Sequence, residues 1–157
     1  MNGNYHTHEC HPMFTQALHE HEHLHQAVDK IHAMLDKYAK HDITQGEVAE
    51  ATGVVQSLYD QMRKHFEQEE EGGYLEEAIT RVPTLAAQAA VLQQQHAELS
   101  QIAGQMLADA GSIGRPVDVW TRLKADYARF AKKLLGHEAA ENKLLERAFN
   151  EDLGVDT

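Results

Sequence analysis

Apolar residues recur at alternating steps of three and four along four long segments of the chain. These stripes run over 14–38, 48–69, 85–110 and 120–148. The spacing places each stripe on one face of an α-helix, which is typical of a helix that turns one side toward a core. The pattern therefore predicts four helices of roughly 25–35 residues, and no β pattern competes with it.

Residues at the ends of these segments are typical of helix boundaries. Proline suits the first turn of a helix, and Thr-x-x-Glu has the form of a capping box. These signals stand at Pro12, Thr44-Gln45-Gly46-Glu47, Pro83 and Pro116. Gly72-Gly73 is expected to end the second helix. The stretch 74–82 is expected to form a short extra turn or helix, in which Leu75 and Ile79 could pack under the end of the bundle.

One apolar seam per helix and short connections predict an all-α fold, an antiparallel up-down-up-down four-helix bundle. The length of 157 residues suits one domain with a single core. We expect a histidine-rich N-terminal arm at 1–11, the bundle at 12–150 and an acidic tail at 151–157.

The net charge of the chain limits the classes of partner that it can bind. The formal net charge is −11 with neutral histidines, and such a surface repels nucleic acid and anionic membranes. No apolar run approaches the ~20 residues that a membrane helix needs. The N-terminus lacks the basic and apolar regions of a signal peptide, and the one cysteine, Cys10, allows no internal disulfide. These features favour a cytoplasmic protein that binds neither nucleic acid nor membranes.

Twelve histidines are far above ordinary usage, and four of them follow a repeated arrangement. Each copy has one lone histidine, a long gap, and then His-x-x-x-Glu. The candidate ligands are His21, His65 and Glu69 in the first copy, and His96, His137 and Glu141 in the second. Each histidine occupies a seam position on its own helix, and each glutamate lies one turn beyond a histidine on the same face. Alternating helix directions place all six groups in one layer near one end of the bundle.

A buried layer of four imidazoles and two carboxylates is costly unless its members are paired or bind metal. Nitrogen and carboxylate oxygen ligands suit iron or manganese, whereas structural zinc sites usually use cysteine, which is absent from the seam. We therefore expect a dinuclear site of iron or manganese bridged by Glu69 and Glu141, with two histidines for each ion. Open positions remain for water, an oxo or hydroxo bridge, dioxygen, nitric oxide or peroxide.

Several other residues have an alternative role beside the simpler one. His25 lies one turn from His21 and could replace or support it. His6, His8, Cys10 and His11 could hold a soft or borderline metal, or form a solvated tail. Glu70 and Glu71 point off the seam, although Glu70 could touch the site edge. Tyr127 is expected in the core, Tyr59 could donate a hydrogen bond, and His32 and His41 are expected at the surface.

The pattern over 21–141 resembles the hemerythrin-like family, also called the HHE cation-binding domain, and the stretch 65–74 is similar to many bacterial members. The resemblance implies a non-haem di-iron centre in a four-helix bundle. Oxygen-carrying members have a fifth histidine, but Leu92 and Ser100 flank His96 at four-residue spacing here. The four-His, two-Glu set is more similar to the domain of bacterial iron-centre repair proteins. Those proteins add an N-terminal segment with paired cysteines, which this sequence lacks.

These features favour a protein that binds or senses a small oxidant, namely dioxygen, nitric oxide or peroxide. The alternatives are an oxidoreductase that consumes peroxide or nitric oxide, and an iron donor or iron-centre repair protein. The sequence assigns no catalytic residue and leaves enzyme activity open. A homodimer or a redox partner protein is compatible with the side faces of a bundle.

Overall fold

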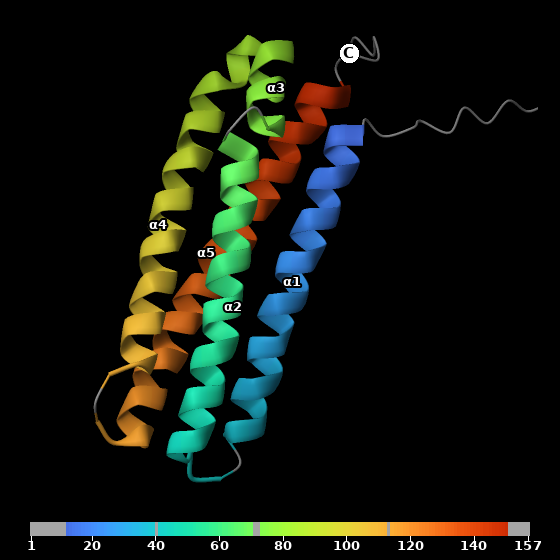
Figure 1. Cartoon of the computed structure of the whole chain (residues 1–157). Helices are drawn as coiled ribbons and strands as arrows, with labels where there is room; N and C mark the ends of the chain where they lie inside the picture. The colour runs from blue at the N-terminus through green and yellow to red at the C-terminus, as the bar shows by residue number, and fades with distance from the viewer. Residues whose placement is uncertain (1–11, 40, 71–72, 113, 151–157) are drawn as a thin grey trace, which may run out of the picture.

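The computed structural model describes residues 12–39, 41–70, 73–112 and 114–150 (Figure 1). Over these residues the chain forms α1 (Pro12–Tyr38), α2 (Gln45–Glu70), α3 (Tyr74–Arg81), the 3-10 turn η1 (Pro83–Leu85), α4 (Ala86–Ala110) and α5 (Pro116–Asn150). The predicted arm at 1–11, with His6, His8, Cys10 and His11, lies outside the described residues. Glu71 and the predicted tail at 151–157 lie outside them as well.

The four long helices run antiparallel to one another in chain order, and α3 lies at the end of the bundle where α2 ends and α4 begins (Figure 1). The predicted all-α four-helix bundle is thus confirmed, including the short extra helix. No described helix combines the length and the apolar character that crossing a membrane requires.

Local sequence signals explain where two of the helices begin and end. At the start of α2, the Glu47 N–H donates to Thr44 Oγ1 at 3.2 Å, and the Thr44 N–H donates to Glu47 Oε1 at 3.1 Å. This reciprocal pair is the predicted capping box. Beyond the end of α2, a Cβ added at Gly73 would lie 1.9 Å from the Gln68 carbonyl oxygen. The chain therefore needs glycine at this position to turn from α2 into α3.

The predicted seams become the core. Every seam residue of α2, α4 and α5 is buried, whereas Phe14 and Leu35 of α1 are only partly buried and Met34 is buried beside Leu35. Tyr127 is buried as expected, and its hydroxyl donates to the Val28 carbonyl at 2.9 Å.

The buried apolar residues form two clusters. The larger cluster fills the long body of the bundle, and the smaller one joins α3 to the neighbouring ends of α1, α4 and α5. Leu75 is fully buried in the smaller cluster, and Ile79 packs against it, as predicted. On α1, α4 and α5, the buried histidines and glutamates occur in sequence between these two clusters, and on α2 His65 and Glu69 lie at the end of the larger cluster. A polar layer is thus enclosed between apolar ones.

Two glycines should respond to alanine in opposite directions. Gly53 lies inside α2, and an added Cβ there has no heavy atom within 4 Å. Gly53→Ala should raise the free energy of unfolding by about 1 kcal/mol, since alanine favours helix over glycine. Gly73→Ala should lower it by more than about 1 kcal/mol, because the Cβ meets backbone oxygen. Urea unfolding at equal metal content measures both changes. Equal stability of the two variants would contradict this account of the turn.

Candidate metal centre

The structure brings the six sequence-predicted residues together in the buried layer. One group contains His21, His65, Glu69 and Glu141, and a second contains Glu69, His96, His137 and Glu141. Within each group, one potential ligand atom per residue lies within 4.8 Å of all the others. Both groups share the two glutamates, so they are adjacent. We call the His21/His65 side the first half of the site and the His96/His137 side the second half.

The outer nitrogen of each histidine ring is held by an oxygen atom. The Nδ1 contacts are His21 to Asn142 Oδ1 at 2.8 Å, His65 to Glu20 Oε2 at 3.0 Å, His96 to Glu70 Oε1 at 2.9 Å, and His137 to Gln95 Oε1 at 2.8 Å. An oxygen acceptor requires that Nδ1 carries the proton, which leaves the Nε2 lone pair available. Histidines that bind metals through Nε2 are oriented in this way.

The outer contacts follow the same rule on both sides. Each half has one carboxylate partner and one amide partner, with Glu20 and Asn142 at the first half and Glu70 and Gln95 at the second. Glu70 therefore does touch the edge of the site, which the sequence pattern left open.

The inner atoms of the layer, in contrast, are hydrogen-bond acceptors that face other acceptors. His96 Nε2 lies 2.7 Å from Glu69 Oε2, and His137 Nε2 lies 3.1 Å from Glu141 Oε2. All four atoms are buried without a hydrogen-bond partner. Leaving such an atom unpaired costs about 1–3 kcal/mol. A cation between the facing lone pairs removes this cost, so the residues present fit a metal ion.

Without metal, protons must take that place. Burial would by itself lower the pKa of His21, but the hydrogen bonds that the ring donates to Glu141 and Glu69 outweigh it and raise the pKa to about 10. The pKa of His96 is likewise raised to about 10 against the effect of burial, by Glu141 and Glu69. Burial alone would raise the pKa of Glu69, but the neighbouring imidazoles hold it far below its usual value. In the metal-free layer, His21 and His96 are therefore protonated and the carboxylates of Glu69 and Glu141 are ionised.

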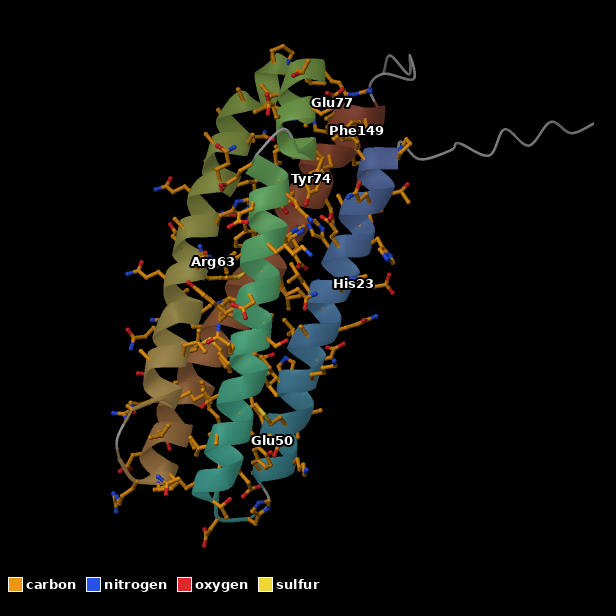
Figure 2. The ribbon with its side chains drawn as sticks, in the orientation of Figure 1. His23, Glu50, Arg63, Tyr74, Glu77 and Phe149 are labelled. Carbon is orange, nitrogen blue, oxygen red and sulfur yellow. The ribbon has the colours of Figure 1, made fainter. Side chains whose placement is uncertain are left out.

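Tyr74 joins the first half from α3, and the sequence pattern did not predict this (Figure 2). Its hydroxyl donates to Glu69 Oε1 at 2.5 Å and lies 3.2 Å from Glu141 Oε1 and 3.3 Å from His65 Nε2. Burial, followed by the charges of Glu141 and Glu69, raises the pKa of Tyr74, so the phenol keeps its proton. The only sequence signal was its position directly after Gly73, at the turn into α3.

His25 does not take the place of His21. It lies outside both ligand groups, its side chain is 48% exposed, and its Nε2 contacts Glu138 Oε2. Glu138 is a second residue that the sequence pattern missed. It is buried, and its Oε1 has no hydrogen-bond partner.

Aromatic packing distinguishes the second half from the first. The Phe66 ring stacks on His96 with a centroid distance of 3.9 Å and an interplanar angle of 9°, and it meets His137 edge-on at 5.8 Å. Surface hollows also reach these two histidines. His137 borders a hollow of about 590 Å³ between α4 and α5, and His96 borders one of about 330 Å³ between α2 and α4.

Comparison with known proteins identifies the family. The model of the hemerythrin HHE cation binding domain matches residues 12–149, which is nearly all of the described chain. The chain therefore belongs to this family. Neither a search of curated proteins nor a search of solved structures found a match. The family's cation-binding character agrees with the buried histidine and glutamate groups.

Metal binding should release protons. Below pH about 10, His21 and His96 of the metal-free chain hold protons that a metal must displace, so metal affinity should rise with pH through the neutral range. Calorimetric titration with a divalent metal in two buffers of different ionisation enthalpy should give different apparent enthalpies. The His41→Gln variant is a control, because its pair with Glu47 lies at the far end of the bundle. Identical enthalpies in the two buffers would contradict the prediction.

Proposed function

We propose that this HHE-family chain holds two non-haem iron ions, one in each half, and binds a small oxidant there. The candidate oxidants are dioxygen, nitric oxide and peroxide. The observation that carries the proposal is the pair of ligand groups that share Glu69 and Glu141. Two carboxylates common to two sets of imidazoles are suited to bridging two ions.

The donor set favours iron or manganese over structural zinc. Imidazole nitrogen and carboxylate oxygen suit iron and manganese, and neither half contains a thiolate that would favour structural zinc. Glu20 and Glu70 add negative charge behind two of the imidazoles, which strengthens these imidazoles as donors and stabilises a cation. Bound iron would supply open coordination positions and a reversible change of oxidation state.

The surroundings favour a small ligand at the second half. The hollow of about 590 Å³ that borders His137 is also lined by three cations, Arg129, Lys132 and Lys133, and by one carboxylate, Glu98, which pairs with Lys133 at 3.4 Å. Positive charge at this opening, on a chain of net charge −11, favours a neutral or anionic ligand over a cation. The Phe66 ring and the apolar clusters above and below limit the water that enters with it.

A second candidate function is an oxidoreductase that consumes peroxide or nitric oxide. Tyr74 favours it, because its phenol keeps a proton within hydrogen-bonding distance of Glu69 and Glu141. A hydroxyl held beside the site could donate a hydrogen bond to a reacting ligand as negative charge develops on it. A carrier or sensor has less need of such a donor.

Metal content tests the di-iron proposal. The chain expressed with ample iron should contain two irons, and zinc alone or no metal would sink the proposal. Glu69→Ala and Glu141→Ala should lose both ions, because both halves share these residues. His21→Ala should affect mainly the first half and retain about one ion. Glu67→Ala and Glu146→Ala remove exposed glutamates from the same helices and should retain both.

Tyr74→Phe separates the two candidate functions. The variant removes one hydroxyl and should keep both irons. If the protein is an oxidoreductase, the rate of peroxide or nitric oxide consumption should fall by about a hundredfold, the scale of a lost hydrogen-bond donor to developing charge. Stopped-flow kinetics and optical spectra of the iron-loaded chain measure this. If the wild type forms a stable complex with oxygen or nitric oxide and consumes neither nitric oxide nor peroxide, the chain is a binding or sensing protein.

A further inference from the structure

One buried carboxylate is not used by the proposed centre. Glu138 is 3% exposed, one of its oxygens contacts His25, and the other has no hydrogen-bond partner. The remaining unpartnered buried side-chain atoms among the described residues all belong to Glu69, His96, His137 and Glu141. These are residues that face a metal position. The unpartnered oxygen of Glu138 therefore indicates a cation there as well, since a buried carboxylate without one is costly.

Glu138 lies beside the first half of the site, although it follows His137 in the chain. His25 follows His21 by one turn of α1, and Glu138 precedes Glu141 by one turn of α5. The contact of His25 with Glu138 therefore lies about one turn from the 2.8 Å contact of His21 Nε2 with Glu141 Oε1. Glu138 does not belong to the ligand group of the first half, and the side chain of His25 is half-exposed at the edge between α1 and α5.

We propose that His25 and Glu138 form an uptake site that captures a divalent cation at this edge and passes it to the first half. The inference rests on the proposed metal centre and adds the route by which the centre is filled. His25 offers an imidazole to solvent, and Glu138 offers a carboxylate oxygen one step further in. A cation would therefore find a ligand first at His25 and then at Glu138, so that it could lose its bound water molecules in steps.

Other approaches to the layer are less suited to a cation. The two apolar clusters close it from both ends of the bundle. The hollow at His137 is lined by three cations, Arg129, Lys132 and Lys133, against one carboxylate, Glu98, and this excess of positive charge repels a metal ion. The hollow at His96 contains Glu67 and Glu70 beside Arg63, but Glu70 holds the Nδ1 side of His96, which carries a proton and has no lone pair.

Metal transfer kinetics test the route. The chain would be freed of metal with a chelator and checked for helicity. Anaerobic uptake of iron(II), and release from the loaded chain to a chromogenic chelator, would then be followed by stopped flow. Glu138→Gln should slow both uptake and release by about tenfold or more, the scale by which a local charge changes the association rate of an ion. Final stoichiometry and affinity should be unchanged. His25→Gln, an exposed change, should slow both rates in the same direction.

Two variants, Glu47→Gln and Glu67→Gln, serve as controls. Glu47→Gln removes a carboxylate from a pair whose histidine, His41, is also 48% exposed, and it should leave the rates unchanged. Rates for Glu138→Gln equal to those of Glu47→Gln would overturn the proposal. A lower final metal content in Glu138→Gln would also overturn the proposal, because Glu138 would then be a ligand. Slower transfer in Glu67→Gln, without slower transfer in Glu138→Gln, would overturn it as well. Failure of the wild type to take up metal would instead reject the proposed function on which this route depends.

Discussion

The fold depends on one energetic constraint, the burial of four imidazoles and two carboxylates in a single layer of a four-helix bundle. An isolated ionised group in such a place would be very unfavourable. The bundle meets this constraint from outside, with a hydrogen-bond acceptor for every Nδ1, and leaves the inner lone pairs facing one another. In the proposed function, a pair of cations completes the arrangement. Apolar clusters on both sides then increase the strength of every interaction inside the layer, because they exclude water.

The two halves share Glu69 and Glu141 but differ in their surroundings. The first half adjoins Tyr74 and Glu138, which are oxygen-bearing groups. The second half adjoins the Phe66 ring and two surface hollows. In the proposed function, this difference separates two tasks. Protons and incoming metal are handled at the first half, and the small oxidant reaches the second half.

Much of this could be predicted from the sequence because helical geometry is local. A period of 3.6 residues determines which positions share a face, so the spacing of His65 and Glu69 already placed both on one side of α2. The apolar seams placed His21 and His96 on the inner faces of their helices. The capping box at Thr44 and the turn at Gly73 gave the ends of the helices, and these in turn gave the depth of the layer.

The sequence by itself thus determined the bundle, the inward faces and the six residues that meet in the layer. Only the tertiary structure decided which side chains from other helices support them. Asn142 reaches His21 from α5, Tyr74 reaches Glu69 because α3 folds back over the bundle end, and Glu138 meets His25 across the edge between α1 and α5. Such contacts depend on the rotation and approach of whole helices. No periodicity within a single helix encodes them, because each contact joins atoms whose separation is set by packing.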